Sequence, residues 1–147
     1  MSAPSDDPTP EQIAADLSNV VRLLVRRLRG VTPATGLSPS QRSVLARLGH
    51  TGPTTTAALA REELVRPQSM RLTVGALEEM GLVERAPDPD DGRQSVVSVT
   101  DQGQRTLTEM RAAKHDWLST VLADGLDPAE RRQLADAIVL LGRLVQK

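Results

Sequence analysis

Three neighbouring polar side chains in one segment of the sequence could recognise the edges of base pairs. Gln68 can bridge N6 and N7 of adenine, and Arg71 can donate two hydrogen bonds to O6 and N7 of guanine or reach a phosphate. Ser69 lies between them and adds a hydroxyl group. The same residues also suit an ordinary solvated helix face, so the elements around them must decide between the two interpretations.

The charges of the chain are unevenly distributed. Residues 17–60 contain six Arg and no acid, whereas residues 1–16 carry four acids and no base. Residues 76–101 carry seven acids against two Arg. The formal net charge is only −1, but phosphates respond to a local basic face rather than to the total. A solvated helix surface would show a similar pattern, so charge alone does not identify a nucleic-acid partner.

Length and composition exclude several other classes of protein. The 147 residues suffice for a hydrophobic core, and the absence of Cys excludes disulfides, thiol nucleophiles and Cys-containing zinc sites. No apolar run approaches the ~20 residues that span a bilayer and residues 1–12 resemble no leader, so we expect a cytoplasmic protein without membrane contact. With two His and no phosphate-binding Gly loop, His-Glu-x-x-His or Gly-x-Ser-x-Gly motif, we expect no metal, no cofactor and no enzyme.

Capping residues mark the starts of the helices. Thr9, Ser38 and Asp127 each precede a Pro, and Gln or Glu follows three residues after each of them, which is typical of a capped helix start. Apolar residues at helical spacing support these starts. The predicted helices cover about residues 10–29, 39–49, 54–60, 67–81, 101–125 and 128–146.

The apolar period changes between the fourth and fifth predicted helices. Residues 82–86 and 95–99 are short β-branched runs, and the segment 87–93 between them is rich in turn-forming residues and acids. This pattern predicts a β-hairpin with an acidic tip. Three short helices followed by a hairpin predict a mostly α-helical fold with a small β-hairpin wing, which is a winged helix-turn-helix. The terminal helices carry broad apolar stripes, which must pack either against a second chain or against one another.

Four stretches occur in a characteristic order along the chain. They are LSPSQRSVL at 37–45, RPQSM at 66–70 with LEEMGLVER at 77–85, DPDDGR at 88–93, and VSVTDQG at 97–103. Together they resemble the MarR family of bacterial transcription regulators, and the likeness covers about residues 11–147. The resemblance implies a homodimer that presents two winged helices to a palindromic site on double-stranded DNA. It also implies repression of transcription and, in many members, release by a small phenolic or lipophilic acid.

The resemblance divides the chain into four parts. They are a flexible N-terminus (1–10), a dimerisation helix (11–35), a winged helix-turn-helix DNA-binding domain (36–100) and dimerisation helices (101–147). The candidate DNA contacts on the fourth helix are Arg66, Pro67, Gln68, Ser69, Arg71 and Leu72. The candidate phosphate contacts are Thr54, Thr55 and Thr56 at the start of the third helix and Arg42 on the second. The residues that would bind an effector stay unassigned.

Two of these positions carry specific expectations. At the wing tip, Arg93 is placed to enter the minor groove, and Asp91 could hold its side chain through a charge-assisted pair. Members of the family commonly have a basic residue where this chain has Leu72, whereas here Arg71 is the adjacent residue. Leu72 could therefore touch a thymine methyl group or pack against the second helix.

A winged helix can also act as a protein-interaction module that never contacts DNA. The acid-free segment 17–60 and Arg93 at the wing tip favour DNA instead. Duplex binding with a steep salt dependence distinguishes the two functions. The sequence therefore predicts a DNA-binding transcription regulator that acts as a homodimeric repressor.

Overall fold

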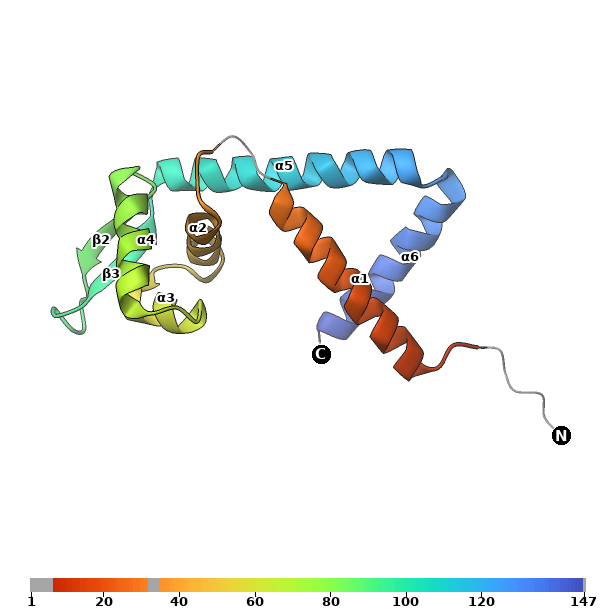
Figure 1. Cartoon of the computed structure of the whole chain (residues 1–147), viewed down its shortest axis with the longest axis horizontal. Helices are drawn as coiled ribbons and strands as arrows, with labels where there is room; N and C mark the ends of the chain where they lie inside the picture. Colours follow the sequence, from red (N-terminus) through yellow and green to blue (C-terminus); the bar gives the residue numbers. More distant parts are fainter. Residues whose placement is uncertain (1–6, 32–34, 147) are drawn as a thin grey trace. The chain divides into compact units, whose positions relative to one another are not determined.

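The computed structural model describes residues 7–31 and 35–146, and most of them are helical (Figure 1). The mostly α-helical fold with a small antiparallel sheet confirms the predicted class. Residues 1–6, which belong to the predicted flexible N-terminus, lie outside the described part. Residues 32–34 lie outside it as well. In chain order the elements are α1 (Pro10–Gly30), α2 (Pro39–Thr51), β1 (Thr54–Thr55), α3 (Thr56–Glu62), α4 (Pro67–Glu79), β2 (Val83–Pro87), β3 (Ser95–Val99), α5 (Asp101–Gly125) and α6 (Pro128–Val145).

Reciprocal caps begin α1, α2 and α6, as the sequence predicted. Thr9, Ser38 and Asp127 each accept a hydrogen bond from the backbone N–H three residues later, and the side chain at that later position accepts one in return. The helix α2 runs past its predicted end at Gly49 and stops at Gly52, which has a positive φ of 83°. Gly49 lies within the helix, and it faces Leu107, which leaves no room there for a side chain.

The sheet has three strands, in the order β1-β3-β2, where the sequence predicted a two-stranded hairpin. Thr54 and Thr55, which were expected to begin the third helix, instead pair with Val97 and Val96 of β3. The helix α3 begins at Thr56, two residues later than predicted, with the Thr55 hydroxyl accepting the Ala58 N–H at 3.1 Å. The reason is that the extended backbone of this short segment fits the free edge of β3.

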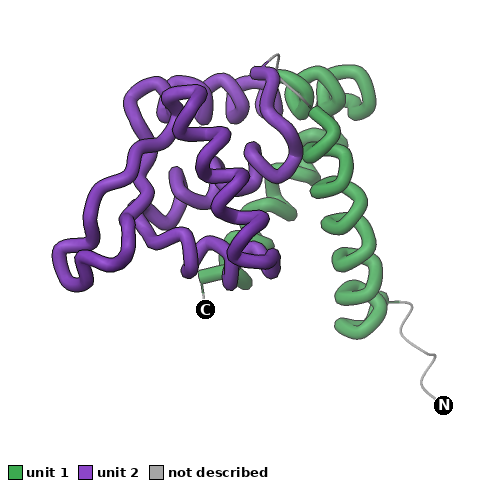
Figure 2. The backbone as a smooth tube through the Cα atoms, turned by 60° about the vertical axis from the view of Figure 1, so that its left-hand side comes forward, with its two compact units in different colours: residues 1–32, 116–147 green, residues 33–115 purple. Residues whose placement is uncertain are grey.

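The chain divides into two compact units, residues 1–32 with 116–147 and residues 33–115 (Figure 2). The buried hydrophobic core described here lies entirely in the second unit, and it includes Met70, Val74 and Leu77 of α4. At 100° per residue, these three lie together on one face of that helix. In contrast, α1 and α6 have no buried residue. Among residues 7–31 and 35–146, no helix combines the length and apolarity needed to cross a membrane.

A junction around Thr100 connects the end of α4 to the start of α5. The Thr100 hydroxyl donates to the carbonyl of Gly81 at 2.6 Å and accepts the N–H of Gly103 at 3.1 Å. Gly81 has a positive φ of 72° and ends the turn after α4. Because β3 leads directly into Thr100, this junction fixes the wing against the end of α4.

Candidate nucleic-acid interface

The helix α4 presents one polar face to solvent. Pro67 occupies its first turn, where a missing N–H costs nothing, and Arg66 precedes it as the N-cap. With Met70, Val74 and Leu77 buried, the opposite face is exposed. The exposed residues of its first half are Pro67, Gln68, Ser69, Arg71 and Leu72. The helix therefore turns the predicted reading residues outwards.

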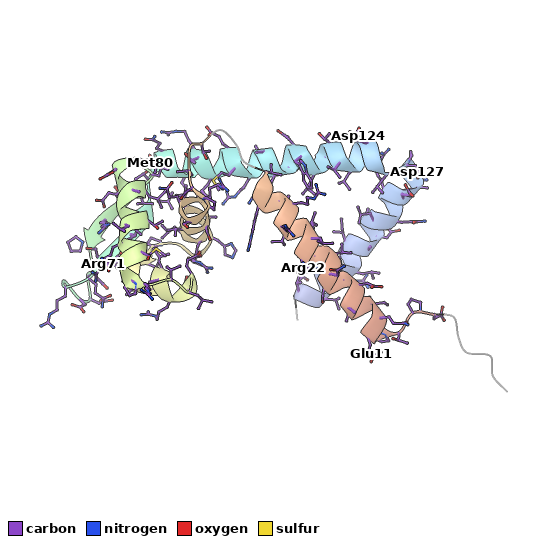
Figure 3. All side chains as sticks on the ribbon, viewed as in Figure 1. Glu11, Arg22, Arg71, Met80, Asp124 and Asp127 are labelled. Atoms are coloured by element: carbon purple, nitrogen blue, oxygen red, sulfur yellow. The ribbon has the colours of Figure 1, made fainter. Side chains whose placement is uncertain are left out.

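One cavity of about 240 Å³ joins this helix to the wing and to the start of α3. Its lining residues are Thr55, Thr56, Ala57, Pro67, Arg71, Arg85, Arg93, Gln94 and Ser95. Figure 3 shows Arg71 on α4, on the side of the helix where the hairpin lies. The structure thus brings together five predicted contact residues from β1, α3, α4 and the turn between β2 and β3. Three guanidinium groups around one hollow form a surface that suits phosphate.

The wing tip is ordered by its own acids. Asp91 accepts the backbone N–H of Arg93 at 3.0 Å, and Asp88 accepts that of Asp90 at 2.9 Å. The predicted ion pair between the Asp91 carboxylate and the Arg93 side chain is wrong, since the described residues show no such contact. The Asp91 carboxylate instead accepts a backbone N–H, because an Asp side chain in a turn readily bonds to the N–H two residues later. Arg93 is one of the residues that line the cavity.

Arg85 is a functional candidate that the sequence analysis missed. Its Nε lies 3.2 Å from the Glu78 carboxylate, which holds the β2 side chain against α4. A Cβ on Gly75 would lie 3.8 Å from the Arg85 Nη2 atom, so the guanidinium passes over this part of the helix. In the sequence, the only indication of this role is a basic residue on the predicted hairpin strand that follows α4. Gln94 and Ser95 were missed as well.

The remaining predicted contacts lie outside the lining of the cavity. Arg42 is half-buried, and its Nη1 donates to the Leu37 carbonyl at 3.0 Å. Thr54 is half-buried in β1. Leu72 is 73% exposed, so the expected alternative that it packs against the second helix is wrong. It lies almost opposite the buried stripe, too far around α4 to reach the core.

A second Arg of α2 serves a structural contact. Arg47 bonds to the Glu63 carboxylate and lies 3.5 Å from that of Glu62. The side-chain hydrogen bond to Glu63 raises the pKa of the Arg47 guanidinium above its ordinary value. This pair links α2 to the end of α3 and steadies the helix-turn-helix. Within the described residues, no cluster of three His, Asp or Glu side chains could hold a metal ion.

Comparisons with known proteins agree with this architecture. The MarR family profile matches residues 37–95. An HTH-type transcriptional regulator of Mycobacterium bovis is 42% identical over 136 residues, which is 92% of this chain and 94% of that protein. A crystal structure of a transcriptional regulator protein from Pseudomonas aeruginosa has a TM-score of 0.78 and 34% identity, covering 95% of this chain and 99% of the other.

A more distant structure shares the fold alone. A mutant form of MarR from Escherichia coli has a TM-score of 0.72 at 21% identity, covering 95% of this chain and 99% of that one. Its resemblance adds support for the winged helix, while the mycobacterial relative establishes the family. The chain belongs to the MarR family of winged helix-turn-helix, DNA-binding transcriptional regulators.

Proposed function

We propose that this protein is a homodimeric repressor that binds a palindromic site on double-stranded DNA and is released by a small organic acid. One observation carries the DNA contact. The exposed start of α4, the start of α3 and Arg93 of the wing surround a single hollow that contains three Arg. Such a surface can grip a backbone while the adjoining helix face reads bases.

The helix α4 would enter the major groove with its first two turns. Gln68, Ser69 and Arg71 are exposed there and carry the hydrogen-bonding groups that read base edges. Arg66 and Pro67 lie at the entrance of the helix, close to the backbone. The first acid of α4 is Glu78, near its far end, so no acid of α4 itself opposes the approach of the reading turns.

The wing would reach the adjacent minor groove. Arg93 suits that position because a narrow minor groove has an enhanced negative potential. Asp88 and Asp91 accept backbone N–H groups, so part of their charge is directed into the turn. Thr55 and Thr56, on the same hollow, would contact phosphate together with Arg85. Thr54 and Arg42, which do not line this hollow, would add phosphate contacts beside it.

The unit formed by residues 1–32 and 116–147 supports homodimer formation. The helices α1 and α6 bury no residue within the described chain, yet both carry large apolar side chains. The exposed ones on α6 are Ile138, Val139, Leu140, Leu141, Leu144 and Val145. A stripe of this kind favours pairing with another chain, here a second copy. Two copies would place two α4 helices about 34 Å apart, in successive major grooves.

A cavity in the same unit supports an acidic effector. It has a volume of about 850 Å³ and is lined by Leu23, Arg26, Arg27, Gly30, Val31 and Trp117. Two guanidinium groups suit a carboxylate, and the aromatic and aliphatic side chains suit an apolar body. Such a ligand would release DNA only if it binds better to the form of the dimer that does not fit the operator.

The test is selection from a random duplex library with the purified protein. We expect an enriched inverted repeat of about 16–20 bp. The variant Arg71→Ala should lose affinity for it, while Arg132→Ala on α6 serves as a control for loss of an exposed Arg. Benzoate should weaken the complex, and uncharged benzamide should not. Weak, salt-sensitive retention without enrichment would contradict the proposal and favour a protein-interaction module.

A further inference from the structure

Leu72 is an exposed aliphatic side chain on the face of α4 that points away from the core. It is 73% exposed, whereas Met70, Val74 and Leu77 on the same helix are at most 1% exposed. At 100° per residue, Leu72 lies about 140–160° around the helix from these three. Its side chain therefore adds nothing to the packing of the domain.

The neighbours of Leu72 on that face are polar. Gln68 and Ser69 precede it by four and three residues, so they lie one turn earlier on the same side of the helix. Gly75 follows by three residues, and the Arg85 guanidinium lies beside it, 3.8 Å from where a Cβ would stand. Within residues 67–79, Leu72 is the only large apolar side chain that is exposed. Leu72 is thus the one large apolar side chain on a face where Gln68 and Ser69 can form hydrogen bonds.

A leucine side chain can recognise only one feature of the standard bases in the major groove. It has no donor or acceptor, and the C5-methyl group of thymine is the only apolar group displayed there. Against cytosine, the same side chain would face an amino group and leave it without a partner, which costs free energy. We infer that Leu72 reads the C5-methyl group of a thymine in each half of the operator.

The inference rests on the proposed function, and it also fixes where the thymine lies. Four residues of α-helix rise about 6 Å, while neighbouring base pairs along one strand are about 3.4 Å apart. The thymine that Leu72 contacts should therefore lie within about two base pairs of the base that Gln68 reads. Gln68 favours adenine, so the half-site should contain an adenine and a thymine at this spacing.

The test replaces each thymine of the selected operator by deoxyuridine, one position at a time. Deoxyuridine keeps the base pair and removes only the methyl group. At the position that Leu72 reads, we expect about a fourfold loss of affinity for one half-site and about a fifteenfold loss for both. Replacing thymine by cytosine should weaken binding, and 5-methylcytosine, which restores the methyl group, should recover part of the loss.

Two variants separate this contact from the others. Leu72→Ala should bind the thymine and deoxyuridine duplexes equally, with an unchanged thermal unfolding temperature because the side chain is exposed. Gln68→Ala should bind more weakly but keep the difference between the two duplexes.

The outcomes distinguish a failure of the Leu72 contact from a failure of the proposed function. If wild-type protein binds an enriched operator but shows no deoxyuridine effect, or if Leu72→Ala keeps that effect, the contact is wrong and the proposed function stands. The same conclusion follows if no thymine lies within about two base pairs of the base read by Gln68. If no duplex is enriched at all, the proposed function and the contact both fail.

Discussion

The carboxylate of Asp91 accepts the backbone N–H of Arg93 at 3.0 Å, so the acid shapes the turn rather than pairing with the Arg side chain. Gln94 strengthens the same turn, because its backbone N–H donates to the Asp91 carbonyl at 3.0 Å. Asp91 and Arg93 therefore have separate tasks in the wing tip. Asp91 orders the backbone, and Arg93 keeps its guanidinium for a ligand.

Two neutral variants at Asp91 isolate the ordering of the turn. Both Asp91→Asn and Asp91→Ala remove a negative charge, but only Asn keeps an oxygen that can accept the Arg93 N–H. We expect Asp91→Ala to bind the operator about fivefold more weakly than Asp91→Asn, since one backbone hydrogen bond contributes about 1 kcal/mol. Fluorescence anisotropy with a labelled duplex measures the ratio. Equal affinities would show that the turn needs no acceptor.

The Arg93 side chain should contribute to the salt dependence of binding. Arg93→Ala removes one cation from the backbone contact, so the slope of log affinity against log salt should fall by about 0.9. Arg93→Lys keeps the charge and loses the planar fork, so it should keep the slope while binding more weakly. A titration over a series of salt concentrations provides both values. An unchanged slope in Arg93→Ala would place this side chain away from the DNA.

Gly103 lies where no larger residue fits. A Cβ there would overlap the Leu82 carbonyl oxygen and lie 2.6 Å from the Val99 Cγ1 atom. Because the first of these is backbone and cannot rotate away, we expect Gly103→Ala to lower the free energy of unfolding by about 2–3 kcal/mol. At Gly92 a Cβ would meet nothing within 4 Å, so Gly92→Ala should change it by less than about 0.5 kcal/mol. Urea unfolding at one protein concentration compares the two variants.

Features that depend on nearby residues could be predicted from the sequence. The caps at Thr9, Ser38 and Asp127 need only a side chain and a partner three residues later, and all three were predicted correctly. The inward face of α4 follows from its period alone. The wing was also predicted, because a change of period and a cluster of turn residues mark it locally.

Features that depend on distant pairing could not be predicted. Thr54 and Thr55 form a strand only because Val96 and Val97, far along the sequence, lie beside them. Arg85 reaches α4 through Glu78, and nothing in its own neighbourhood indicates that contact. The exposure of Leu72 was left open for the same reason. Its position on α4 is compatible with an exposed side chain or with packing against a neighbouring helix.

The hydroxyl group of Thr100 should stabilise the junction between α4 and α5. Thr100→Val keeps the shape but leaves the Gly81 carbonyl and the Gly103 N–H without the partner that they have at 2.6 and 3.1 Å. We expect a loss of about 1–3 kcal/mol in the free energy of unfolding. Thr100→Ser, which keeps the hydroxyl group, should lose less. If Thr100→Ser is the less stable of the two variants, the methyl group rather than the hydroxyl group matters at this position.

The apolar face of α6 should hold the two copies of the chain together. Leu144 is 63% exposed, and Ile138 on the same helix is 57% exposed. Burying a charge in an interface without a partner is costly, so Leu144→Glu should produce a monomer in sedimentation velocity. Arg132→Glu places the same charge on the polar side of α6, about 120° around the helix from Leu144, and should leave a dimer.

The winged-helix unit of the monomer produced by Leu144→Glu should stay folded, because the buried core lies entirely within residues 33–115. It should also lose most of its affinity for the full inverted repeat, since each half-site alone provides only half of the contacts. Circular dichroism and anisotropy with the full and half operators measure these two properties. A dimer in both variants would move the interface elsewhere, and a monomer in wild type would contradict the proposed homodimer itself.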